Sequence, residues 1–309
     1  MSNGKEKQTF NYEIDLSDLF KLLIQKRYVV SLIILFFSFF SVVYSLSLPN
    51  VYKSSAILVV VDESSGGANN LLSRYGDLAG LAGINLPSGA GENKSDLAIE
   101  KIKSRDFTKH LITYEGTLEN ILASESYNPN NGEIKYDTDI FDGGVWVREA
   151  PKGREVIPSY IEAHDYLMSD VLNITKDRET GFITLTIQHV SPSYSKELLE
   201  LIIQEINAIT KLNDQKESRD ALAYLNKMLQ ETKVIEVKKS INELIQNQLE
   251  TLMLTNIKND YFLTIIDAPF LPEEKSSPSR AVISIIGFLL GILFSLIYLV
   301  VVFLRSRNN

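Results

Sequence analysis

Two long apolar runs without a charged side chain constrain this chain more than any other feature. They cover residues 28–48 and 281–304. At a rise of about 1.5 Å per residue, these 21 and 24 residues form helices of roughly 31 Å and 36 Å, each enough to cross the hydrocarbon core of a bilayer. The polar side chains in both runs are Ser and Tyr, whose hydroxyls can bond to carbonyls of their own helix. Both runs are therefore predicted to be transmembrane helices.

The charges beside the two runs predict the orientation of the chain. Lys26 and Arg27 directly precede the first run, and Arg305 and Arg307 directly follow the second. The positive-inside rule then places residues 1–27 and the tail 305–309 in the cytoplasm, and residues 49–280 in a domain outside the membrane.

The predicted outer domain is acidic. The first 28 residues carry five Lys/Arg and four Asp/Glu, and the last six carry two Arg, so the total net charge of −8 leaves −11 for residues 29–280. Nucleic-acid binding depends on clustered basic residues that neutralise phosphates. This class of partner is therefore excluded. The sequence contains no cysteine, so disulfides and thiol chemistry are excluded as well.

A cleaved signal peptide is the competing interpretation of the first run, because residues 45–47 form a small-x-small site. Signal-peptide apolar regions extend over about 7–15 residues after a short basic leader. This run is longer and follows 27 residues that contain an amphipathic pattern at residues 14–23. An uncleaved anchor with a short membrane-surface helix before it is the favoured interpretation.

The residues between the two runs predict a mixed α+β domain. A β-branched strand is expected at residues 52–61, and a β-hairpin at residues 172–188 with its turn at Gly181. A helix is expected at residues 92–115, capped by Ser95 and broken near Ser104. A Ser191–Pro192 pair begins a further helix, and residues 261–266 form another strand. The small-residue segment 71–84 is compatible with a close-packing helix or with a loop.

Residues 220–256 carry apolar side chains three or four positions apart, without Gly or Pro. They predict one extended helix of roughly 55 Å, with two helices broken near Thr232 as the alternative. An apolar stripe on so long a helix needs a partner, either in its own chain or in a neighbouring protomer. The candidate oligomer face consists of Leu222, Leu225, Leu229, Ile241, Leu244, Leu249 and Leu252.

A proline-rich collar, residues 267–280, directly precedes the second run. Proline fixes φ and lacks a backbone donor, so this segment is expected to be stiff and extended, and to couple the outer domain to the helix that follows. Within that helix, Gly287 and Gly291 form a G-x-x-x-G pattern, which lets another helix approach closely. The candidate motif residues of the collar are Pro269, Pro272, Ser277, Pro278 and Arg280.

With these elements in this order, the chain resembles the polysaccharide co-polymerases, the chain-length determinant (Wzz) proteins of bacterial envelopes. The collar that leads into a glycine-containing span is similar to the proline-rich segment of that family. The leader at residues 14–16, the strand after the first span, the Ser191–Pro192 helix start and the long helix support the resemblance. The chain departs from the family pattern at residues 273–275, where denser prolines are common.

The resemblance implies a kinase-less, O-antigen type regulator of polysaccharide chain length. Such a protein is a ring-shaped homo-oligomer of the inner membrane, with an α/β base domain and a long helix in the periplasm. It acts with an integral-membrane (Wzy-type) polymerase on a lipid-linked polysaccharide such as the O-antigen of lipopolysaccharide. The resemblance implies no catalysis and no cofactor.

Enzyme motifs give no competing interpretation. The sequence lacks the G-x-x-x-x-G-K-[ST] phosphate loop, and His110, His164 and His189 lack the spacing of metal ligands. Carboxylate pairs such as Asp165 and Asp170 can be nominated in any acidic chain and are assigned to solvated helix faces. The aromatic residues Trp146, Tyr160 and Tyr166 are assigned to buried core, although they could stack on sugars.

Three alternative functions remain. One is a co-polymerase for exopolysaccharide or capsule export, and another is an adaptor for a separate tyrosine kinase, against which the long helix argues. The last is a membrane receptor, which the short tail disfavours because residues 305–309 leave no room for a signalling domain.

Overall fold

The computed structural model describes residues 23–61, 90–257 and 260–307. Their contacts form two units, one of residues up to Pro49 and from Ser277 onward, the other of residues from Asn50 to Ser276. The leader predicted around residues 14–20 and the small-residue segment 71–84 lie outside the described residues.

The first unit is a pair of packed helices, α2 (Arg27–Ser47) and α10 (Arg280–Arg307). Both are long and apolar enough to cross a membrane by length and composition. Their ends lie within three residues of the predicted runs. The rings of Phe37 and Phe294 stack with centroids 4.8 Å apart, and Ser41 Oγ donates to Ile283 O at 2.7 Å. The large apolar side chains on the other faces are exposed in this unit.

The second unit is built on a four-stranded sheet with the order β6 (Leu172–Lys176), β7 (Ile183–His189), β1 (Tyr52–Val60), β8 (Leu263–Asp267). All neighbouring strands are antiparallel. The predicted hairpin is β6–β7, and Gly181 in its turn has φ +72°, a conformation that glycine adopts without a steric penalty. The predicted strands at residues 52–61, 172–188 and 261–266 are confirmed.

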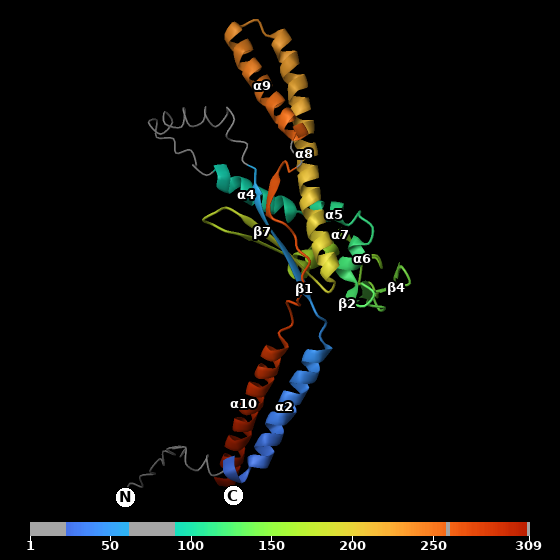
Figure 1. The fold of residues 1–309 in the computed structure, drawn as a ribbon, viewed down its shortest axis with the longest axis vertical. Helices are drawn as coiled ribbons and strands as arrows, with labels where there is room; N and C mark the ends of the chain where they lie inside the picture. Colours follow the sequence, from blue (N-terminus) through green and yellow to red (C-terminus); the bar gives the residue numbers. More distant parts are fainter. Residues whose placement is uncertain (1–22, 62–89, 258–259, 308–309) are drawn as a thin grey trace, which may run out of the picture. The chain divides into compact units, whose positions relative to one another are not determined.

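One face of this sheet holds the core. Leu58 on β1 and Leu185 and Ile187 on β7 are fully buried, because alternate side chains of a strand point to the same face. The long helix α8 (Pro192–Glu231) packs on β1 and β7 (Figure 1). Its residues Leu199 and Ile202 are also fully buried. Helix α8 begins as predicted, with Pro192 in its first turn and Ser191 Oγ accepting the Tyr194 N–H.

Short helices extend the core beside the sheet. They are α4 (Ala90–Ile102), α5 (Arg105–Leu111), α6 (Thr117–Leu122), α7 (Tyr160–Tyr166) and the π-helical turn η2 (Leu167–Val171). The predicted break falls where expected, since Ser104 caps α5 by accepting the Phe107 N–H. The prediction of Ser95 as a cap was wrong: α4 begins at Ala90, so Ser95 is an interior, buried residue whose hydroxyl donates to Gly181 O.

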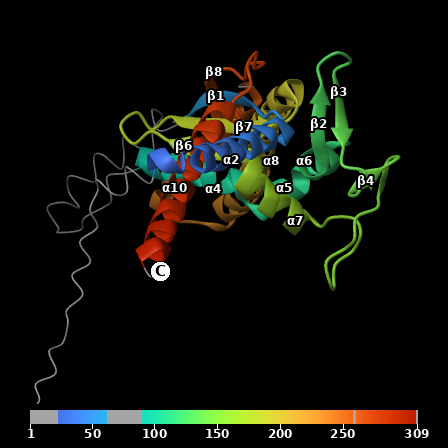
Figure 2. The same cartoon turned by 90° about the horizontal axis from the view of Figure 1, so that it is seen from below.

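Two small hairpins lie apart from the main sheet, as Figure 2 shows for β2 and β3. They consist of β2 (Ser124–Asn128) with β3 (Glu133–Tyr136), and β4 (Phe141–Asp142) with β5 (Val145–Trp146). The expectation of buried aromatic residues in this region was wrong for the two tyrosines. Tyr160 and Tyr166 are 37% and 42% exposed, while Trp146 is half-buried against Phe141.

The prediction of a single helix over residues 220–256 was wrong. Helix α8 ends at Glu231. Helix α9 (Ile235–Ile257) begins after three intervening residues and packs back along α8 (Figure 1). Thr232 has extended backbone angles, φ −79° and ψ 132°. The alternative of a break near Thr232 is therefore the observed one. The physical reason is that an antiparallel hairpin gives each apolar stripe a partner, whereas a single helix would leave the stripe in water.

Candidate functional site

The predicted glycine contact lies between the two apolar helices. A Cβ atom on Gly287 would collide with the side chain of Ser41, and a Cβ on Gly291 would lie 2.9 Å from Ile34 Cα. A side chain at either position would therefore push α2 and α10 apart. Both glycines are buried in this contact.

The collar residues are divided between the two units. Pro269 and Pro272 are buried in the second unit, where Ser54 Oγ on β1 donates to Phe270 O at 2.7 Å. Ser276 N donates to Val51 O at 2.8 Å, which ties the end of this segment to the residue before β1. Ser277 and Pro278 are half-buried, and Arg280 is the first residue of α10.

The predicted oligomer face is divided by the helical hairpin. Ile241 is 6% exposed, and Leu222, Leu225, Leu229 and Leu252 are half-buried. Leu244 and Leu249 are 49% and 47% exposed. Part of the stripe is thus covered within its own chain, and another part remains available to a second molecule.

The three histidines lie in separate environments. His110 Nε2 lies 2.7 Å from Glu205 Oε2, and His164 Nδ1 lies 3.0 Å from Thr108 Oγ1. His189 is buried, and its Nδ1 accepts the N–H of Ser191 while its Nε2–H donates to Asn120 O. Burial lowers the pKa of His189. Within the described ranges, no group of three or more metal-ligating side chains occurs.

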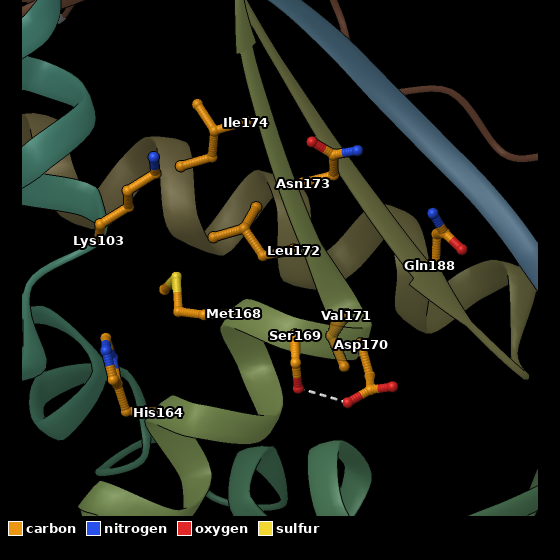
Figure 3. A pocket seen from close by; sticks show the side chains of 10 residues that line it. All are labelled: Lys103, His164, Met168, Ser169, Asp170, Val171, Leu172, Asn173, Ile174 and Gln188. Atoms are coloured by element: carbon orange, nitrogen blue, oxygen red, sulfur yellow. Dashed lines mark hydrogen bonds between the residues drawn. The ribbon is translucent and has the colours of Figure 1, made fainter.

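A cavity of about 590 Å³ opens at the β6 end of the sheet. Lys103 lies on one side of it, after the end of α4, and His164 on α7 lies on another (Figure 3). The turn η2 supplies Met168, Ser169 and Asp170, and the strands supply Asn173 and Gln188, as well as apolar side chains. Three stretches of the sequence, residue 103, residues 164–174 and residue 188, therefore meet at this cavity, which we call the β6 pocket.

Most polar groups of the β6 pocket have unused hydrogen-bonding capacity. Asp170 accepts a short hydrogen bond from Ser169, its neighbour in the chain. The side chains of Lys103, Asn173 and Gln188 make no hydrogen bond or ion pair with the described part of the chain. Met168 and Leu172 contribute apolar surface (Figure 3). Six of the ten lining residues are polar, so the pocket offers a ligand mainly hydrogen-bonding groups.

An ion-pair cluster stabilises the start of α7, the helix that contributes His164 to the β6 pocket. Glu162 accepts from Arg148 Nη1 at 2.9 Å and Nη2 at 3.1 Å, and it accepts the Ser159 N–H at 3.0 Å. Ser159 Oγ accepts the Glu162 N–H, which completes a capping box at the start of α7. These hydrogen bonds, chiefly those from Arg148, lower the pKa of Glu162 to about 2.

Sequence reasoning missed the β6 pocket and recognised only isolated members of it. The spacing of His164 does not indicate a metal site, Asp170 is expected on a solvated helix face, and no motif predicts a joint role for Lys103, Asn173 and Gln188. The nominated carboxylate pair is not assembled there, because Asp170 lines the pocket and Asp165 does not. The one available signal was the Ser159-x-x-Glu162 capping box, which locates α7 but not its neighbours.

Comparison with known proteins gives one family match. Residues 12–114 match the family described as "Wzz: Chain length determinant protein". No curated protein matches the chain.

The solved structures that match include two of low identity. A full-length bacterial polysaccharide co-polymerase is 13% identical, with a TM-score of 0.45 over 96% of this chain and 99% of the other. A fragment of WzzB, a polysaccharide co-polymerase from Salmonella Typhimurium, is 14% identical, with a TM-score of 0.33 over 74% of this chain and all of the fragment. Neither similarity is strong enough to bear on function, so the assignment rests on the family match. Residues 12–114, a third of the chain, are similar to the chain length determinant (Wzz) family.

Proposed function

We propose that this protein regulates the chain length of a bacterial surface polysaccharide, the O-antigen of lipopolysaccharide, without catalysing a reaction itself. The match of residues 12–114 to the chain length determinant family carries the proposal. In this proposal the protein is a ring-shaped homo-oligomer that acts as a co-polymerase beside an integral-membrane polymerase of the Wzy type. The polymer whose length it regulates is a lipid-linked polysaccharide.

The proposed location is the bacterial inner membrane. Helices α2 and α10 have the length and composition of membrane spans, and basic residues flank both on the sides nearest the chain ends. The unit from Asn50 to Ser276 would then lie in the periplasm, where such polysaccharides are assembled. The exposed residues Leu244 and Leu249 on α9 are candidates for contacts between protomers.

The proposed role of the collar is to couple the outer unit to the second span. Pro269 and Pro272 are buried, and hydrogen bonds fasten the segment to β1 and the residue before it. Ser277, Pro278 and Arg280 continue it into α10. The geometry of the sheet would reach the helix pair through this connection.

A gel profile of the surface polysaccharide tests the function. A strain that lacks the gene is compared with the same strain complemented by the gene. We expect the modal cluster of O-antigen lengths to disappear in the deletion strain, leaving a monotonic decay, and to return on complementation. An unchanged lipopolysaccharide ladder would overturn the O-antigen assignment and direct the same comparison to capsule and exopolysaccharide.

A further inference from the structure

We propose that the β6 pocket binds a sugar unit of the growing polysaccharide, a neutral or N-acetylated saccharide rich in hydroxyl groups. The inference rests on the proposed function, because that function brings polysaccharide to this domain. It adds a defined contact between the chain and the polymer. The pocket volume of about 590 Å³ lies within the range of roughly 300–1,000 Å³ that is usual for small-ligand sites.

The free polar groups of the pocket match the chemistry of sugar hydroxyls. Each hydroxyl both donates and accepts a hydrogen bond, and the amides of Asn173 and Gln188 also offer both roles from one group. Neither amide has a side-chain hydrogen bond to the described residues. Lys103 adds donors and Asp170 adds an acceptor, and hydrogen bonds to charged groups are the stronger ones. The pocket therefore presents to a polyol several groups, three of them exposed, whose hydrogen-bonding capacity is little used within the described chain.

The apolar part of the pocket suits the non-polar face of a sugar ring. Met168 and Leu172 lie on the same side of β6 as Lys103 and His164, and Asn173 and Gln188 lie on the other side (Figure 3). The C–H groups of a pyranose can pack on such side chains while its hydroxyls reach the rim. Burial of this surface would add hydrophobic stabilisation to the hydrogen bonds.

The backbone around the pocket is unusual in two respects. The turn η2, which forms part of its wall, is π-helical, and single π-helical turns occur frequently at functional sites. Strand β6 is at the end of the sheet order among the described residues, so its outer edge has backbone donors and acceptors not used by a neighbouring strand. These groups add to the hydrogen-bonding capacity beside Lys103 and His164.

The charge of the pocket selects against polyanions. Lys103 and Asp170 contribute one charge of each sign, so the pocket lacks the cluster of cations that phosphate-rich ligands require. The rival occupant is an extended peptide segment that pairs with the edge of β6. The saccharide is favoured because the lining comes from three stretches of sequence, residue 103, residues 164–174 and residue 188, rather than from residues along one strand.

Binding to the purified full-length protein in lipid nanodiscs tests the proposal. The probe is the polysaccharide released from the lipopolysaccharide of the source strain by mild acid, titrated by calorimetry. We expect the double variant Asn173→Ala/Gln188→Ala, and separately Lys103→Ala, to raise the Kd at least tenfold. Thr175→Ala is the matched control, since Thr175 is exposed two residues after Asn173 on β6 and does not line the pocket. This control should bind within twofold of the unchanged protein.

Two results would overturn the assignment of a saccharide to the β6 pocket and leave the proposed function intact. One is equal binding by the unchanged protein and all variants, which would place the polymer elsewhere. The other is no binding by the unchanged protein although deletion of the gene still alters the chain-length distribution.

A photo-crosslinking residue at position 173 separates the two occupants. A crosslink to the probe supports the saccharide, and a crosslink only to a second protein chain overturns it in favour of a peptide. Circular dichroism of each variant confirms that it is folded before its binding is compared.

Discussion

At the scale of single residues, the Glu162 carboxylate is held by several hydrogen bonds and an ion pair. Its carboxylate accepts hydrogen bonds from Nη1 and Nη2 of Arg148 and from the backbone N–H of Ser159. The side chain of Glu162 is only 11% exposed. Hydrogen bonds to a charged group stabilise a fold by about 1.5–3 kcal/mol when buried. The carboxylate therefore holds the start of α7, and with it the side of the β6 pocket that carries His164.

Replacement of Glu162 by glutamine is expected to destabilise the protein by about 1–3 kcal/mol at neutral pH, because the charge that pairs with Arg148 is lost. The measurement is denaturant unfolding followed by circular dichroism. Glu149→Gln is the control, since Glu149 is exposed and makes no hydrogen bond or ion pair within the described chain. Equal stability of the two variants would show that the cluster contributes nothing.

The same carboxylate gives an acid-dependent component of stability. Folding lowers the pKa of Glu162 from 4.5 to about 2. The stabilisation is therefore fully present above pH 4.5 and is lost as the pH falls from there to about 2, where the folded state also takes up the proton. Glu162→Gln should unfold with a smaller loss of stability across this interval than the unchanged protein does.

At the scale of elements, the helix pair depends on two positions without side chains. Gly287→Leu is expected to separate α2 from α10, because the new side chain would occupy the space of Ser41. The chain has no cysteine, so Phe37→Cys and Phe294→Cys report on the contact by crosslinking. We expect the crosslinking yield to fall severalfold with Gly287→Leu. Ala281→Leu, on an exposed position of α10, should leave it unchanged.

The helical hairpin gives a second prediction at this scale. Ile241→Ala should loosen α8 and α9, at a cost of about 2–4 kcal/mol, because Ile241 is 6% exposed. Leu244→Ala should cost much less, since Leu244 is 49% exposed on the same helix. Hydrogen exchange of residues 220–257 is the measurement. Equal exchange in the two variants would contradict the packing of the hairpin.

The predictability of these elements depends on how local their causes are. The two apolar runs, Gly181 in its turn and Ser191–Pro192 at a helix start are set by a few adjacent residues, and the sequence predicted them. The break at Thr232 lacks Gly or Pro and follows from the pairing of two stripes, which is a tertiary effect. The β6 pocket combines Lys103, His164 and Gln188, ordinary residues on separate elements, and only the folded chain brings them together.

At the scale of the whole molecule, the proposed topology places the two ends of the chain and the unit between the helices on opposite sides of a membrane. Because the natural sequence lacks cysteine, single cysteines can map it. In intact spheroplasts we expect a membrane-impermeant maleimide to label Thr175→Cys, and to label Arg305→Cys only after the membrane is permeabilised. Labelling of both in intact spheroplasts would refute the two-pass arrangement.

The hydrogen bond from Ser276 N to Val51 O closes the unit from Asn50 to Ser276 at its base. The segments that enter and leave the unit are joined by this one hydrogen bond, so the unit has the connectivity of a cassette inserted into a helical hairpin. Termini that lie close together are what allow a domain to be inserted into another chain. An exchange of this cassette between two relatives, with junctions at positions 50 and 276, would thus keep the host helices intact and transfer any property that resides in the cassette.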